Sequence, residues 1–107
     1  MANPIFTWPD RRHNDPAHDQ LAAFLVMDIQ QSPDWAEDLL EQIEAIESGD
    51  LATWERIGNA FRLELSVQGA TLEDLVDEAG SIQQVPLGEF RAAVLAWYQQ
   101  TAGQESQ

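Results

Sequence analysis

Residues 33–48 carry the clearest local structure signal in the chain and constrain how the remainder can fold. Ser32 is a favoured helix N-cap, Pro33 suits the first helical turn, and Gly49 is a favoured residue just past a helix end. Between these boundaries the apolar residues recur at the spacing of one helix face, namely Trp35, Leu39, Leu40, Ile43 and Ile46. The pattern predicts a helix over residues 33–48 with one face buried.

The opposite side of this predicted helix is strongly acidic. Residues 34–50 hold seven carboxylates and no basic side chain: Asp34, Glu37, Asp38, Glu41, Glu44, Glu47 and Asp50. Spacings of three and four residues bring like charges together, which destabilises a helix by about 0.2–0.5 kcal/mol per pair. Glu44 and Glu47 also lie near the negative end of the helix dipole. Because this charge opposes folding, we infer that a function maintains it.

Length and composition exclude several classes of protein. The chain has 107 residues, which suits one domain over residues 1–107, and its formal charge is −14, with 19 acidic residues against five arginines and no lysine. Nucleic acids and anionic membranes would be repelled. The absence of cysteine excludes disulfides, thiolate metal sites and a cysteine nucleophile. Residues 1–10 lack the basic start and apolar segment of a secretion signal, so we expect a cytoplasmic protein.

The N-terminal third is predicted to contain an arm and a helix. Residues 1–14 mix prolines, arginines and aromatic residues without a period, which indicates an extended arm on the surface. Asp15 followed by Pro16 is typical of an N-cap and first helical position. A helical stripe up to Gln31 follows, formed by Leu21, Phe24, Leu25 and Ile29. A strand over residues 21–29 remains possible, because the run is short and nearly continuous in apolar residues.

After a short connection, the period changes from helical to alternating. In residues 58–67 one side is apolar, formed by Phe61, Leu63, Leu65 and Val67, which predicts an amphipathic strand. Gln68 and Gly69 suit a turn, and a second strand from Ala70 towards Leu75 would complete an antiparallel hairpin. Residues 71–79 also fit a helix that begins with a capping box. We prefer the strand, because residues 58–67 need a pairing partner.

The last element is predicted to be a helix that begins at Pro86 and ends near Gln99. Its apolar face is formed by Leu87, Phe90, Val94 and Trp97, and residues 101–107 are expected to fray. The predicted fold class is therefore α+β, with two N-terminal helices, a small antiparallel β-hairpin or meander, and a C-terminal helix. Residues 15–100 form its folded core.

Metal binding and catalysis have little support in the sequence. His13, Asp15, His18 and Asp19 are possible zinc ligands, but their spacing fits no closed site and Asp15 already suits an N-cap. The alternating acids and central glycine of a calcium loop are missing. No serine lies in a Gly-x-Ser-x-Gly turn, and no glycine-rich loop leads into a helix. We therefore predict no metal, no cofactor and no enzymatic activity.

A second acidic cluster and the arginines complete the candidate residues. The cluster consists of Glu73, Asp74, Asp77 and Glu78. Together with residues 34–50 it predicts a docking surface whose field attracts a basic protein, with Trp35, Trp54 or Tyr98 as an aromatic anchor. The alternative is a solvated face that keeps the protein soluble. Arg56, Arg62 and Arg91 are predicted to form internal ion pairs that hold helix against hairpin.

One stretch of the sequence has a familiar order and spacing. It reads Trp54-Glu55-Arg56-x-Gly58-Asn59-x-Phe61-x-Leu63-x-Leu65, follows an acidic helix, and is closed by Leu87-x-x-Phe90 and Ala96-Trp97. Over about residues 35–98 the chain resembles small acidic YacL-like proteins and the immunity proteins of contact-dependent growth inhibition and related bacterial toxin systems.

The resemblance implies a cytosolic protein that binds and blocks one cognate toxin domain, often a nuclease. It assigns no contact residue by position. A nuclease carries a basic substrate channel, for which an acidic inhibitor is suited. The alternative is an acidic adaptor or nucleic-acid mimic that binds a host DNA-binding protein through the same charge.

Overall fold

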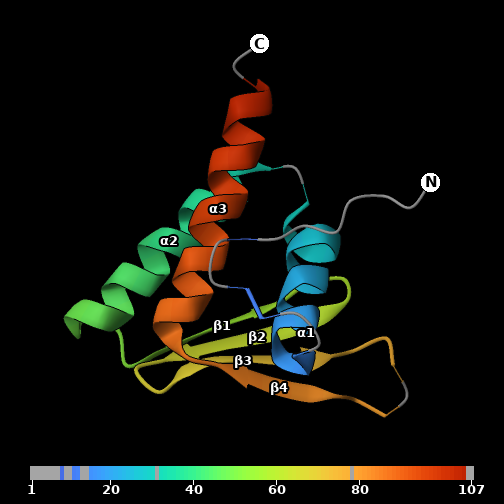
Figure 1. Cartoon of the computed structure of the whole chain (residues 1–107). Coiled ribbons are helices and arrows are strands. Elements are labelled where there is room, and N and C mark those ends of the chain that lie inside the picture. Colours follow the sequence, from blue (N-terminus) through green and yellow to red (C-terminus); the bar gives the residue numbers. More distant parts are fainter. Residues whose placement is uncertain (1–7, 9–10, 13–14, 31, 78, 106–107) are drawn as a thin grey trace.

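The computed structural model describes residues 8, 11–12, 15–30, 32–77 and 79–105. Their order is α1 (Pro16–Phe24), a π-helical turn η1 (Leu25–Ile29), α2 (Pro33–Ser48), β1 (Thr53–Ile57), β2 (Phe61–Ser66), β3 (Gly69–Asp74), β4 (Ile82–Val85) and α3 (Leu87–Glu105) (Figure 1). The order of two helical segments, an antiparallel sheet and a final helix confirms the predicted α+β fold class.

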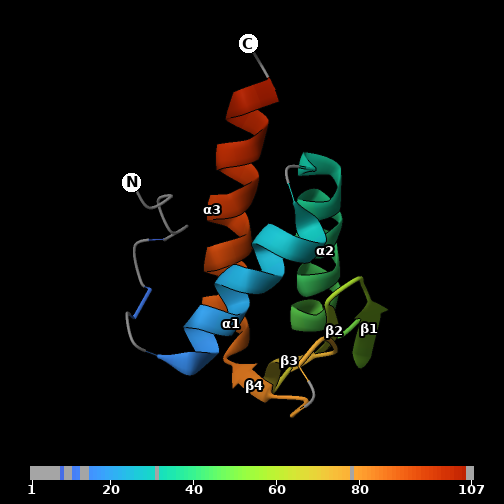
Figure 2. The same cartoon turned by 90° about the vertical axis from the view of Figure 1, so that its right-hand side faces the viewer.

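The four strands form an antiparallel meander in the order β1-β2-β3-β4, and the helices cover one face of it (Figures 1 and 2). Phe61, Leu63 and Leu65 on β2 are buried beneath the helices, whereas Arg62 and Glu64 between them lie half-buried on the other face. The alternation of residues 61–66 therefore follows the pleat of a sheet with one covered face. The sheet forms one layer and the helices form the other.

Helix α2 has the boundaries that the sequence predicted. The Ser32 side chain accepts a hydrogen bond from the Trp35 N–H at 3.3 Å, and Gly49 closes the helix with φ of 89°. Its buried face differs from the predicted one, because Ala36 is fully buried, Leu40 is half-buried and Trp35 is 50% exposed. The inclusion of Trp35 in the buried face was therefore wrong. An aromatic residue in the first turn of this helix is left at the surface.

The segment after Asp15 is helical, so the strand alternative for residues 21–29 was wrong. Asp15 caps α1 by accepting a hydrogen bond from the Ala17 N–H at 2.9 Å. The last turn widens into η1 and ends at Gln30, whose φ is 59°. The predicted end at Gln31 lies outside the described residues.

Strands β2 and β3 confirm the predicted hairpin, and the helix alternative for residues 71–79 was wrong for the described part of that segment. Residues 58–60 form the turn between β1 and β2 and are not part of a strand. Both edge strands were missed. In β1 no side chain is fully buried, and in β4 only Val85 is. An edge strand with few buried apolar residues has a weak alternation signal.

The C-terminal helix is longer than predicted. It continues to Glu105 through residues that were expected to fray. The buried Thr101 supports this extension, because its hydroxyl donates to the Trp97 carbonyl oxygen at 3.0 Å. At the other end of the chain, Trp8 belongs to the predicted surface arm but is only 3% exposed and packs in the core.

Asp28 joins the helical layer to the sheet. The residue is 6% exposed, and its carboxylate accepts hydrogen bonds from the N–H groups of Ala60 and Phe61 at 2.8 and 2.9 Å. Gly58 lies directly against it, because a Cβ at this position would overlap the Asp28 carboxylate. The turn between β1 and β2 is thus held by a side chain from η1.

We expect Gly58→Ala to lower the free energy of unfolding by about 1–3 kcal/mol, because the added methyl group must displace a buried, hydrogen-bonded carboxylate. Gly88→Ala is the matched control, since a Cβ there meets nothing within 4 Å on a helix. It should raise stability by up to about 1 kcal/mol. Urea unfolding of both variants measures the difference. Equal changes would show that the contact between Gly58 and Asp28 is not tight.

Candidate functional site

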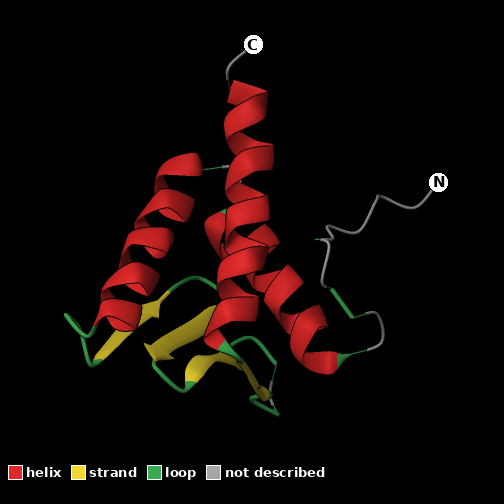
Figure 3. Ribbon diagram, turned by 60° about the vertical axis from the view of Figure 1, so that its left-hand side comes forward, coloured by secondary structure: helices red, strands yellow, loops and turns green. Residues whose placement is uncertain are grey.

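The acidic residues of α2 lie together on its uncovered side. We define the acidic face as Asp34, Glu37, Asp38, Glu41, Glu44, Glu47 and Asp50. All are exposed except Asp38, which is half-buried and accepts a hydrogen bond from the Gln42 side-chain amide at 3.3 Å. The buried side of α2 meets α3 and the sheet, and its outer side is free of other elements (Figure 3). The predicted cluster therefore forms one continuous surface.

The acidic face has no internal counter-charge in the part of the chain that the structure describes. The ion pairs there involve Arg11, Arg12, His18 and Arg62, and their partners lie outside this face. Arg56 stacks its guanidinium over the Trp35 ring in the first turn of α2, at 4.7 Å from the centroid. Among the described residues, the carboxylates of the acidic face therefore have no cationic side chain as an ion-pair partner.

A shallow pocket of about 350 Å³ lies at the C-terminal half of α2. It is lined by Glu41, Glu44, Ala45, Ser48 and Asp50. Three of these residues are carboxylates, and the negative end of the helix dipole adds to their field. The pocket is thus complementary to a cationic side chain.

The second predicted cluster is separate from this face. Glu73 lies on β3, with an oxygen 3.9 Å from Arg62, and Asp74 accepts hydrogen bonds from the N–H groups of Val76 and Asp77 at 2.9 and 3.0 Å. Asp77 in turn accepts from the Ala79 N–H at 3.2 Å. Glu78 lies outside the described residues. In Figures 1 and 3 the connection from β3 to β4 lies away from α2, so the two clusters do not form one surface.

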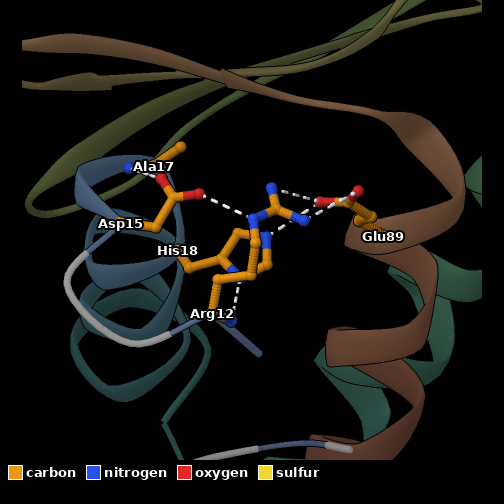
Figure 4. Close-up of polar contacts among 5 residues, drawn as sticks. All are labelled: Arg12, Asp15, Ala17, His18 and Glu89. Carbon is orange, nitrogen blue, oxygen red and sulfur yellow. Dashed lines mark hydrogen bonds and ion pairs between the residues drawn. The ribbon is translucent and has the colours of Figure 1, made fainter. Parts of the chain in front are cut away.

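The candidate metal ligands around residue 18 are occupied by other contacts (Figure 4). His18 is fully buried, and its Nδ1 accepts a hydrogen bond from the Arg12 N–H at 2.9 Å. The ring proton therefore lies on Nε2, which donates to Glu89 at 2.8 Å. Asp19 pairs with Arg11 at 2.9 Å, and His13 lies outside the described residues. Both nitrogen atoms of His18 are thus committed to protein partners.

This network attaches the N-terminal segment to two helices. Arg12 contacts Glu89 on α3 at 3.1 Å and Asp15 at the start of α1 at 2.9 Å. Trp8 lies beside the His18 ring, with 5.3 Å between ring centroids. Sequence reasoning missed Glu89 because it lies 71 residues from His18. The sequence did contain a signal that His18 is buried, because it lies three residues before Leu21 on the apolar face of α1.

The ion pairs of this network shift the acidity of its members. The hydrogen bond from Arg12 holds the pKa of Glu89 below its ordinary value of 4.5, and the contact with His18 acts in the same direction. Arg12 likewise lowers the pKa of Asp15, while the hydrogen bond with Glu89 raises the pKa of Arg12. A carboxyl group with a lowered pKa stabilises the fold at higher pH and loses this effect in acid.

The predicted internal ion pairs of the arginines are only partly present. Arg62 pairs with Glu55 and Glu73 on neighbouring strands, so it links strands and not helix to hairpin. Arg56 does connect α2 to the sheet, but it does so by stacking on Trp35. Arg91 is exposed on α3, and among the described residues no ion pair includes it.

Comparisons of the chain with models of known protein families, with curated proteins and with solved structures give no match. Among the described residues, no helix combines the length and apolar character that crossing a membrane requires.

We expect the stability contributed by Glu89 to depend on pH. Because its pKa is lowered, this contribution is complete above the ordinary value of 4.5 and is lost as the pH falls below it. Glu89→Gln should therefore destabilise the protein near neutral pH, and the difference from the native chain should shrink in acid. Urea unfolding at a series of pH values measures this effect. Glu47→Gln, which removes an exposed carboxylate of the acidic face, is the control and should not destabilise the protein near neutral pH, because it removes no ion pair and relieves repulsion.

Proposed function

We propose that this protein is an immunity protein that binds a basic toxin domain, a nuclease, in the cytoplasm and neutralises it by occlusion. The observation that carries the proposal is the acidic face, which is exposed, continuous and without internal counter-ions among the described residues. Such a face attracts a cationic cleft at long range, and its carboxylates lie against the basic residues of the cleft on contact. The protein does not transform a substrate in this proposal.

The linear charge density of α2 supports a partner that normally accepts a nucleic acid. The helix carries six carboxylates from Asp34 to Glu47. At about 1.5 Å rise per residue, they span roughly 20 Å, with a mean spacing of about 3.9 Å between successive charges. One strand of DNA carries a charge about every 3.4 Å along the helix axis. The acidic face therefore approximates the charge that a nuclease channel is built to hold.

The rigidity of α2 also favours binding. Leu39, Ile43 and Ile46 are fully buried, so the helix is already ordered before a partner arrives. Association then costs less conformational entropy than the folding of a mobile acidic segment would. The shallow pocket between Glu41, Glu44 and Asp50 offers a place for one arginine or lysine of the partner.

Trp35 is the aromatic anchor that this arrangement favours. Its side chain is 50% exposed in the first turn of α2, whereas Trp54 and Tyr98 pack against the core. Tryptophan and arginine are the residues that most often dominate binding energy at protein interfaces. The stacked pair of Trp35 and Arg56 adds an apolar contact beside the acidic face.

The alternative function is an acidic adaptor or nucleic-acid mimic that binds a host DNA-binding protein. The same charge spacing favours it, since DNA-binding proteins also present basic channels. The identity of the partner separates the two. The immunity function requires that a toxin domain, expected in the adjacent upstream reading frame, is the protein bound.

We expect the triple change of Glu37, Glu41 and Glu44 to Lys to abolish protection of cells that express this toxin domain. The folded state should be equally stable or more stable, because repulsion between neighbouring turns is relieved. Growth of the co-expressing cells measures protection, and urea unfolding measures stability. Full protection by this variant would exclude the acidic face as the interface.

A matched pair of variants separates local charge from net charge. Changing Glu37, Glu41 and Glu44 to Gln removes three negative charges from the acidic face. Changing the exposed Gln84, Gln99 and Gln100 to Lys makes the same change of net charge, from −14 to −11, elsewhere. Only the first variant should weaken toxin binding, and the affinity of the native chain should fall as salt is added. Equal weakening by both would show that net charge alone drives association.

A further inference from the structure

Strand β1 forms one edge of the sheet, and its outer hydrogen-bonding groups can be assigned. The Gly58 N–H donates to the Phe61 carbonyl at 2.9 Å, and Arg56 and Trp54 pair with Leu63 and Leu65 in the same register. Bonded and non-bonded pairs alternate in an antiparallel ladder. The N–H and C=O groups of the alternate residues therefore point away from β2, at Thr53, Glu55 and Ile57. No backbone hydrogen bond to these groups occurs within the described residues.

The two edge strands of the sheet differ in how far they are protected from pairing with another strand. The other edge strand, β4, has four residues and is followed by Pro86. At its start the Gln20 side chain donates to the carbonyls of Ser81 and Leu72 at 3.0 and 2.8 Å, and α1 packs against the strand. Prolines, short strands and covering elements are the usual protection of an edge. Strand β1 has neither proline nor lysine, and Figure 2 shows no described element beside its outer edge.

Negative charge borders the β1 edge on both faces of the sheet. On the outer face Glu64 of β2 lies opposite Glu55, which is exposed and forms an ion pair with Arg62 of β2. On the covered face α2 packs against β1 and presents its acidic face outward, and the exposed Asp50 precedes the strand. Ile57, which is 68% exposed, adds an apolar position two residues after Glu55 in the chain. The carboxylates around this edge, which are Asp50, Glu55, Glu64 and those of α2, outnumber its two cations, Arg56 and Arg62.

The charge determines the occupant of this edge. A second copy of the chain would bring a further charge of −14 to a surface that is already acidic. An extended basic segment of another protein would be attracted instead, and its backbone would bond the free groups of β1.

From this arrangement we infer that β1 receives an extended basic strand of the partner, which adds to the sheet as a fifth strand. Its alternate side chains contact Glu55 and Glu64 on one face and the acidic side of α2 on the other. The inference rests on the proposed function for the basic character of the partner, but it names a different contact. The acidic face attracts the partner, and the edge of β1 fixes its register.

Hydrogen exchange of the full chain, followed by NMR at low salt, tests this inference. The probes are two synthetic peptides of equal charge, one of alternating Lys and Val and one of Lys and Ala with helical spacing. With the Lys-Val peptide at about ten times its Kd, exchange at the amides of Thr53, Glu55 and Ile57 should slow about tenfold. The amides of Trp54 and Arg56 should change little, because they already bond to β2.

The outcomes distinguish the two proposals. If the peptides bind and shift only α2 resonances, the edge inference is overturned while the acidic face remains supported. The edge inference also fails if the Lys-Ala peptide protects the β1 amides equally. If neither peptide binds, the edge inference is overturned, while the proposed function still depends on the protection assay with the toxin domain.

A pair of variants at one position separates hydrogen bonding from charge. Glu55→Pro removes an outward N–H without removing a bond to β2, since proline is tolerated at such edge positions. Glu55→Thr removes the same charge and keeps the N–H. We expect the proline variant to bind the Lys-Val peptide about two- to tenfold more weakly than the threonine variant. Equal affinities would overturn strand addition, and the exchange experiment on the native chain remains decisive if the proline variant does not fold.

Discussion

Burial of one apolar face holds α2 in place against the repulsion of its own carboxylates, and the rest of the structure depends on this balance. Leu39, Ile43 and Ile46 are fully buried, and each such side chain contributes about 1.5–3 kcal/mol relative to an exposed one. Each like-charge pair on the opposite face costs only about 0.2–0.5 kcal/mol. Packing against α3 and the sheet therefore outweighs the repulsion. A helix with this charge is stable only as part of the folded domain.

Two buried polar groups fix how the helical layer sits on the sheet. Asp28 binds the turn between β1 and β2, and His18 joins the N-terminal segment to Glu89 on α3. In both cases the buried atoms have hydrogen-bond partners, as burial of a polar group requires. These hydrogen bonds fix the positions of the helices, because a shifted helix would leave Asp28 or His18 buried without a hydrogen-bond partner. Polar contacts of this kind select one packing of the layers where apolar contacts alone allow several.

The two surfaces assigned to a partner have different physical roles. The acidic face acts over distance, and its effect is weakened by salt. The edge of β1 acts only on contact, because backbone hydrogen bonds need aligned groups. Their proximity follows from the chain path, since Gly49 ends α2 and the strand begins at Thr53. A basic partner guided to α2 would therefore arrive next to an open strand edge.

Local signals in the sequence determined most of the elements, because a cap, a period or a turn depends on residues close together in the chain. Ser32 and Gly49 bounded α2, Asp15 began α1, and the alternation from Phe61 predicted β2. The charge of the acidic face could also be predicted, since it depends on residue type and helical spacing. Tertiary structure alone decided the edge strands, the exposure of Trp35 and the bond between His18 and Glu89 across 71 residues. These features depend on which surfaces meet, and contacts between distant segments leave no periodic trace in the residues that form them.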